Sequence, residues 1–146
     1  MPARVTVSWA LSVRISIVGG VYSPPKECFP LSDVLEEEKS RAKATYKEAF
    51  ALFVKGESEG AIALYREAIA VDRTLAIAWN GLSIALAKQG NLGEAIIAAE
   101  KLVELEPDDP LSHTNLSRIL MQKGLIPEAE DARAKAMGLQ MRMQKS

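Results

Sequence analysis

The sequence predicts an all-α protein built as a right-handed superhelical stack of three antiparallel helix pairs. Three observations predict this class. The chain matches itself at an offset of 34 residues, each 34-residue block holds two runs with helical periodicity, and a glycine separates the two runs in every block. Because a single helix pair cannot bury both of its faces, such pairs stack and share one continuous core.

The three blocks, 42–75, 76–109 and 110–143, align without a gap. The identical columns are Leu52, Leu86 and Leu120; Gly56, Gly90 and Gly124; and Ala61, Ala95 and Ala129. The eighth position is always small, with Ala49, Ser83 and Ser117. Small residues at the eighth and twentieth positions allow two helices to approach closely. Glycine after the first run suits a helix C-terminal cap, because it tolerates positive φ.

The middle block resembles the tetratricopeptide repeat pattern. It carries Trp79, Leu82, Ser83 and Leu86, followed by Gly90, Ala95 and Pro107. The outer blocks depart from this pattern, since Thr45 and His113 occupy the Trp slot and Arg133 stands where an aromatic residue is common. Terminal repeats are often atypical, so the resemblance extends over residues 42–143. It implies a stacked helical fold and a role in binding other proteins.

Local signals predict where the helices begin and end. Asp33, with Glu36 three residues later, is a capping-box-like start, and Asp109 followed by Pro110 is a cap with proline in the first turn. We expect helices at 33–55, 58–71, 75–89, 92–105, 109–123 and 126–144.

The composition changes near residue 32, which divides the chain into an N-terminal segment (1–32) and a repeat domain (33–146). The segment holds four of the seven prolines and an alternation of apolar residues from Val5 to Ile17 that is typical of a strand. A lone strand leaves its backbone groups unpaired. Three interpretations stay open: the segment is poorly ordered, it docks on the repeat domain or a second copy, or it is an over-extended start.

The composition also bears on the class of function. The formal net charge is −1 and 5% of residues are aromatic, which favours neither nucleic acid nor an anionic membrane as partner. No apolar stretch reaches the roughly 18 residues that span a membrane. Arg14 interrupts the apolar residues 5–18, so we do not expect a secretory signal. The single Cys28 fits a reducing compartment, and we expect a cytoplasmic protein.

The residue types that carry catalysis or bind metals are scarce. His113 occupies the slot of Trp79, so we expect it to pack between helices, and no third member would complete a nucleophilic pair with Cys28. Asp108 and Asp109 are interpreted as helix caps. We therefore predict no catalytic residue, no metal site and no cofactor, and we expect that the protein is not an enzyme.

In tetratricopeptide repeat proteins the first helices of the pairs line a concave groove. The resemblance implies a partner-binding groove with an apolar floor and basic ends, formed by Lys43, Tyr46, Lys47, Phe50, Ile77, Asn80, Ile84, Leu111, Thr114 and Arg118. An alternative is that some inward positions, notably Phe53, Ala87 and Met121, pack against neighbouring helices. A groove of this kind suits a helix or extended peptide with apolar anchors.

One subtype of the family reads the acidic C-terminal tails of chaperones with Lys, Asn and Arg at fixed positions. This chain has Tyr46, Phe50, Gly81, Leu111 and Asn115 there. None of them matches, so we expect no binding of a free acidic chaperone tail.

The expected partner is another protein, and the expected function is that of an interaction module. Two alternatives stay open: a holding chaperone for a secreted or assembling client, and a self-assembling structural subunit. A homodimer through the C-terminal end or the N-terminal segment is a further hypothesis.

Overall fold

The computed structural model describes residues 31–146, so the strand-like pattern of the N-terminal segment lies outside the described residues. The chain divides into two units, Met1–Glu37 and Glu38–Ser146. The helices of the described residues are α2 (Leu31–Lys55), α3 (Ser58–Val71), α4 (Ala76–Lys88), α5 (Leu92–Leu105), α6 (Pro110–Lys123) and α7 (Ile126–Lys145).

These six helices confirm the six that the sequence predicts, with every boundary within two residues of its expected position. The cap expected at Asp109 is confirmed, because its side chain accepts a hydrogen bond from the backbone N–H of Leu111 at 3.1 Å. The capping box expected at Asp33 is wrong. Helix α2 begins at Leu31, which places Asp33 inside the first turn, where its charge faces the positive end of the helix dipole.

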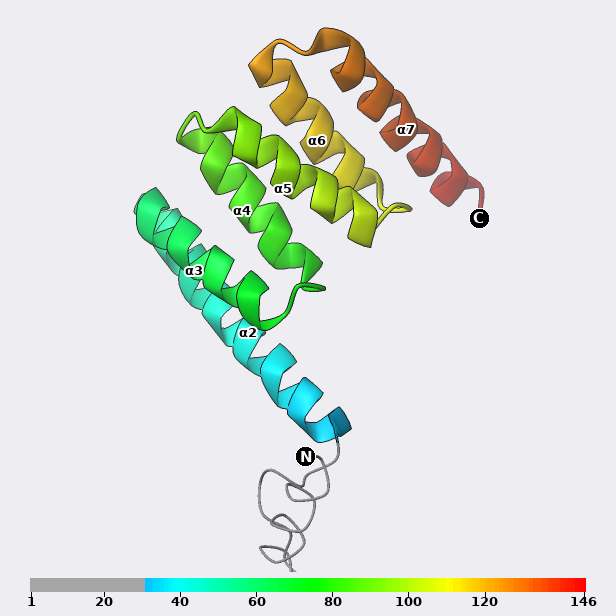
Figure 1. The fold of residues 1–146 in the computed structure, drawn as a ribbon. Coiled ribbons are helices and arrows are strands. Elements are labelled where there is room, and N and C mark those ends of the chain that lie inside the picture. The colour runs from blue at the N-terminus through cyan, green and yellow to red at the C-terminus, as the bar shows by residue number, and fades with distance from the viewer. Residues whose placement is uncertain (1–30) are drawn as a thin grey trace, which may run out of the picture. The chain divides into compact units, whose positions relative to one another are not determined.

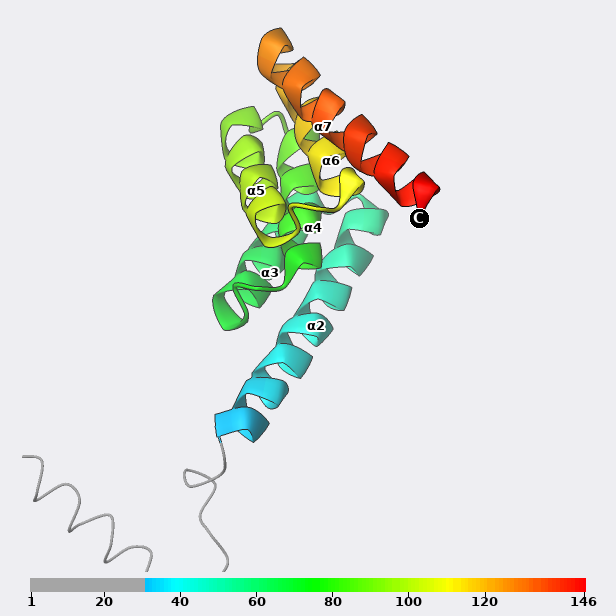
Figure 2. The same ribbon diagram turned by 90° about the vertical axis from the view of Figure 1, so that its right-hand side faces the viewer.

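From α3 to α7, each helix packs against the next one along the chain, and α4 also contacts α6 (Figure 1). The same succession of helices is visible after a quarter turn in Figure 2. No strand occurs between residues 31 and 146. The part of the chain that the structure describes is therefore an all-α stack of helix pairs, as the repeat predicts.

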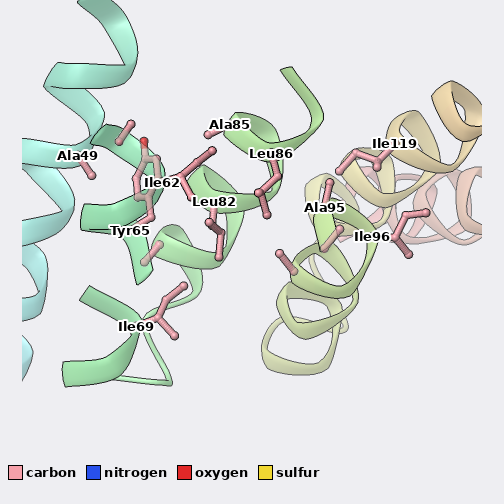
Figure 3. Close-up of a cluster of buried hydrophobic side chains, with 14 of the residues drawn as sticks. Ala49, Ile62, Tyr65, Ile69, Leu82, Ala85, Leu86, Ala95, Ile96 and Ile119 are labelled. Carbon is pink, nitrogen blue, oxygen red and sulfur yellow. The ribbon is translucent and has the colours of Figure 1, made fainter. Parts of the chain in front are cut away.

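The core runs through the stack and consists of aliphatic side chains around one buried tyrosine, Tyr65 (Figure 3). The small residues of the eighth and twentieth positions are all buried. Between α6 and α7 they touch directly, because the Ser117 hydroxyl donates to the carbonyl oxygen of Ala129 at 2.7 Å. A helix pair can approach this closely only where both facing residues are small.

The three repeated glycines have the conformation that the sequence predicts. Gly56, Gly90 and Gly124 have φ values of 91°, 86° and 86°, and within residues 31–146 no other residue has positive φ. Since residues with a Cβ rarely adopt this conformation, the glycine column marks the turn between the two helices of each pair.

Two aromatic rings at the fourth position of their blocks hold the loops that precede their helices. The Trp79 indole Nε1–H donates to the carbonyl oxygen of Arg73 at 2.9 Å. In the next block, His113 Nε2 lies 2.8 Å from the carbonyl oxygen of Pro107. Arg73 and Pro107 are equivalent positions, each six residues before its ring. His113 is buried, which confirms the structural role expected for it.

Candidate binding surface

The ten residues predicted to meet a partner lie on α2, α4 and α6, the first helices of the three pairs. We call these ten residues the candidate binding surface. On each helix they recur at intervals of three, four or seven residues, apart from the adjacent Tyr46 and Lys47, and this spacing places them on one side of the helix. All ten lie at least partly on the surface of the molecule.

Three apolar side chains of the candidate binding surface are well exposed. Leu111 is 73% exposed, Phe50 50% and Ile77 47%, one on each of the three helices. Tyr46 stacks against Phe50 with ring centroids 6.3 Å apart. Exposed apolar side chains on three neighbouring helices are a feature of surfaces that contact other molecules.

Tyr46 connects this surface to the core. Its ring lies 5.8 Å, between centroids, from the ring of Tyr65, which is 1% exposed. Burial raises the pKa of the Tyr46 hydroxyl, and burial followed by the charge of Tyr46 raises the pKa of Tyr65 to about 12. Both hydroxyls are therefore protonated at neutral pH, and the aromatic part of the surface is uncharged.

A buried polar network joins α4 to α6 behind the candidate binding surface. The Asn115 amide donates to Asn80 Oδ1 at 3.0 Å and to Ser83 Oγ at 2.7 Å. Arg118 in turn donates from Nη2 to Asn115 Oδ1 at 3.0 Å. In residues 31–146 no buried side-chain polar atom lacks a hydrogen-bond partner. A fully satisfied network of this kind holds two helices in a single register.

Two pockets open beside these residues. The first, of about 230 Å³, lies between α4, the end of α5 and the start of α6. Its lining residues are Ile77, Asn80, Leu102, Glu106, Asp109, Leu111 and Ser112. It brings together three of the predicted residues, two apolar and one amide, and it has two carboxylates at its edge.

The second pocket, of about 390 Å³, lies between α6 and α7. Its lining residues are Thr114, Ser117, Arg118, Met121, Gln122 and Arg133. Thr114 and Arg118 were predicted, whereas Arg133 was not, because only first helices were expected to contribute. A signal was present in the sequence: Arg133 occupies the column of Tyr65 and Ala99, which are both buried. A charged residue at a block position that is otherwise buried indicates that this position is open to solvent in the third block.

The charge of the candidate binding surface is positive. Lys43, Lys47 and Arg118 are exposed, and none of the ten residues is acidic. On α4, which lies beside α2, Lys88 Nζ sits 4.9 Å from the centroid of the Phe53 ring, as a cation–π contact. Phe53 is half-buried, as the alternative interpretation of the inward positions expected.

Residues 31–146 contain neither a metal-binding cluster nor a membrane-spanning helix. No cluster of three or more His, Cys, Asp or Glu side chains within residues 31–146 is arranged to hold a metal ion. None of helices α2 to α7 combines the length and the apolar character needed to cross a membrane.

The comparison with known proteins gives a family match for part of the chain. Residues 46–110 match the model of the tetratricopeptide repeat family, and the solved structures that resemble the chain include tetratricopeptide repeat domains. Together with the fold, this match supports the assignment of the chain to the tetratricopeptide repeat family. The search of curated proteins gave no match.

Among solved structures, the crystal structure of MamA is similar over 79% of this chain and 71% of its own, with 26% identity and a TM-score of 0.69. The second tetratricopeptide repeat domain of Spaghetti (RPAP3), bound to the HSP90 peptide SRMEEVD, is similar over 73% of this chain and 98% of its own, with 20% identity and a TM-score of 0.69. The Yersinia enterocolitica type III secretion translocator chaperone SycD is similar over 68% and 76%, with 23% identity and a TM-score of 0.65. The last two likenesses show the fold alone.

Proposed function

We propose that this protein is an interaction module that binds a peptide or helix of another protein on the candidate binding surface. The observation that supports this most directly is the exposure of Leu111, Phe50 and Ile77 on three neighbouring helices of the stack. Burying one such side chain against a partner contributes about 1.5–3 kcal/mol. A partner segment with matching apolar side chains thus gains free energy from several contacts at once.

The rigidity of the surface also supports the proposal. Tyr46 rests on the buried Tyr65, and the hydrogen bonds of Asn115 to Asn80 and Ser83 hold α6 against α4. A surface that is ordered before binding loses little conformational entropy when the partner arrives.

The similar structures agree with protein binding as the function. One of them is a tetratricopeptide repeat domain in complex with a peptide, and another is a secretion translocator chaperone. The peptide SRMEEVD of the first complex is acidic at its C-terminal end. That this chain does not bind such a tail stays a prediction, since its residues at the equivalent positions differ.

The experiment is a quantitative affinity capture from native cell extract that compares the wild-type chain with a Phe50→Glu/Leu111→Glu variant. Both side chains are at least half exposed, so the variant is expected to keep its helicity and melting temperature. We expect at least one partner to be lost. An Ile97→Glu variant serves as the matched control, because Ile97 is an exposed apolar residue on α5, a second helix of its pair.

Partners that are captured equally by all three proteins would show that the candidate binding surface is not the working surface. The alternative of a holding chaperone makes a different prediction. A holding chaperone binds several segments of one client and suppresses the aggregation of that client, which light scattering measures. A self-assembling subunit instead increases in mass with its own concentration.

A further inference from the structure

The pocket between α6 and α7 combines cationic and apolar lining residues. Arg118 and Arg133 supply two guanidinium groups, Met121 supplies an apolar side chain, and no lining residue is acidic. Within residues 31–146 Arg118 forms no ion pair with a carboxylate. The exposed Arg133 lies 3.9 Å from Glu130, at the outer limit of an ion pair. The positive charge of these two guanidinium groups is only weakly compensated by nearby carboxylates, so the pocket attracts an anion. A planar carboxylate matches the hydrogen-bonding geometry of a guanidinium group.

Arg118 is held in position from the interior of the molecule. Its Nη2 donates to Asn115, and the amide of Asn115 is fixed in turn by Asn80 and Ser83. Only part of the donor capacity of the guanidinium is used in this network, so its remaining N–H groups are available to a ligand in the pocket. Because the side chain is already oriented, its immobilisation costs little when a ligand binds.

The pocket between α4, α5 and α6 has charged residues of the opposite sign. Ile77 and Leu111 offer apolar surface, while Glu106 and Asp109 give its edge a negative charge. An acidic group is repelled there and attracted to the arginines. The two pockets therefore differ in the sign of their charge, which determines the direction in which a charged segment can lie across them.

Helix α6 sets the distance between the two pockets. Leu111 and Arg118 are seven residues apart on one face of this helix, which corresponds to about 10 Å at 1.5 Å per residue. An extended partner spans about 10 Å with three residues, and a helical partner spans it with seven.

We propose that the partner segment carries an acidic side chain that binds between Arg118 and Arg133, and an apolar side chain about 10 Å away that packs against Ile77 and Leu111. The inference rests on the proposed function and specifies its partner. It predicts a partner with an acidic and an aliphatic residue spaced by three in an extended segment or by seven in a helix.

The test is a selection of random peptides from a display library on the full chain, followed by affinity measurements with synthetic peptides that are amidated at their C-terminus. We expect the selected peptides to share an acidic and an aliphatic residue at one of the two spacings. Changing the acidic residue to its amide is expected to weaken binding to the wild type by about tenfold or more.

The variants test which side chains read the acid. In Arg118→Ala/Arg133→Ala the same acid-to-amide change is expected to have almost no effect, since its partner groups are gone. The single variant Arg133→Ala is expected to keep the fold intact. The exposed Arg133 side chain has only one ion-pair neighbour in the described residues, Glu130, so its removal breaks no other ion pair. Arg73→Ala, an exposed arginine of the α3–α4 loop, is the control that should keep the full tenfold effect.

The outcomes separate the two proposals. Peptides that require Leu111 and Phe50 but show no preference for an acid would overturn this inference and leave the proposed function standing. An acid preference that persists in the double arginine variant would also overturn it. Peptides that ignore the candidate binding surface altogether would count against the proposed function itself.

Discussion

The ring of Tyr65 on α3 occupies the space beside Gly81 on α4. A Cβ atom at position 81 would lie 2.5 Å from Cε1 and 2.6 Å from Cζ of this ring, well inside van der Waals contact. Packing against Tyr65 is therefore the reason for glycine at position 81. Backbone conformation is not the reason, because the φ of Gly81 is not positive. The contact joins the second helix of one repeat to the first helix of the next.

Gly81→Ala is expected to destabilise the fold by about 1–3 kcal/mol, because overpacking in the core outweighs the helix propensity gained. Thermal unfolding followed by circular dichroism measures this. The control is Gly138→Ala in α7, where an added Cβ meets no atom within 4 Å. It should stabilise by about 0.5–1 kcal/mol. Equal melting temperatures for the two variants would contradict the close approach of Tyr65 to Gly81.

The buried hydroxyl of Tyr65 is expected to titrate late. Its pKa is raised to about 12 by burial and, second, by the charge of Tyr46. Absorbance of tyrosinate during an alkaline titration should show a component near this value that Tyr65→Phe removes. A titration complete near pH 10 in the folded protein would contradict the burial of this hydroxyl.

The same shift makes stability depend on pH. The pKa of Tyr65 is higher in the folded chain than in the unfolded chain, so the folded state holds the proton more tightly. Its contribution is fully present below pH 10 and is lost as the pH rises towards 12. The loss is on the order of 2 kcal/mol. Urea unfolding between these pH values should therefore show a flatter pH dependence for Tyr65→Phe than for wild type.

Removal of the Asn115 amide should destabilise the stack. Asn115→Ala leaves Asn80 and Ser83 without their cross-helix hydrogen bonds, which costs about 1–3 kcal/mol for buried polar groups. Thr114→Ala next to it removes only an exposed bond to the Pro110 carbonyl and should stay within about 0.5 kcal/mol of wild type. Denaturant midpoints of the two variants compare these costs, and equal midpoints would show that the network contributes nothing.

A larger side chain at position 117 should separate α6 from α7. The Ser117 hydroxyl lies 2.7 Å from the Ala129 carbonyl, so Ser117→Leu would have to push the two helices apart. We expect a loss of about 1–3 kcal/mol from this overpacking. Ser117→Ala keeps the volume small and should cost less. Amide hydrogen exchange of α7 provides the second readout, because it should accelerate in Ser117→Leu and remain close to wild type in Ser117→Ala.

Much of the fold follows from columns of the 34-residue repeat. Leucine, glycine and alanine recur at positions where the backbone geometry of a helix pair permits few substitutes, and Gly56, Gly90 and Gly124 adopt the positive φ that the column predicts. The same glycines predicted where the first helix of each pair ends. The start of α2 was less accurate, because α2 begins at Leu31, eleven residues before the first block of the repeat.

The candidate binding surface was less predictable, because its contacts depend on residues that break the columns. Asn115 stands at a position where the other blocks have Lys47 and Gly81, so no periodicity indicates its hydrogen bonds to α4. Arg133 stands at a block position where the other two blocks have the buried residues Tyr65 and Ala99, so in the sequence it looks like an unfavourable charge in the core. Only the placement of α7 beside α6 shows that this arginine lines a pocket.

The fourth position of the blocks shows how a repeat can change residue type and keep its geometry. Trp79 and His113 differ in size, yet each places a ring nitrogen at hydrogen-bond distance from a carbonyl oxygen in the loop six residues earlier. Thr45 stands at the same position of the first block. It lies inside the continuous helix α2, so the residues just before it form helix and not a loop. Its hydroxyl donates to the backbone carbonyl oxygen of Arg41, one turn earlier in the same helix. The ring at this position therefore serves to close the preceding loop, and a block whose first helix extends back through that loop needs no ring there.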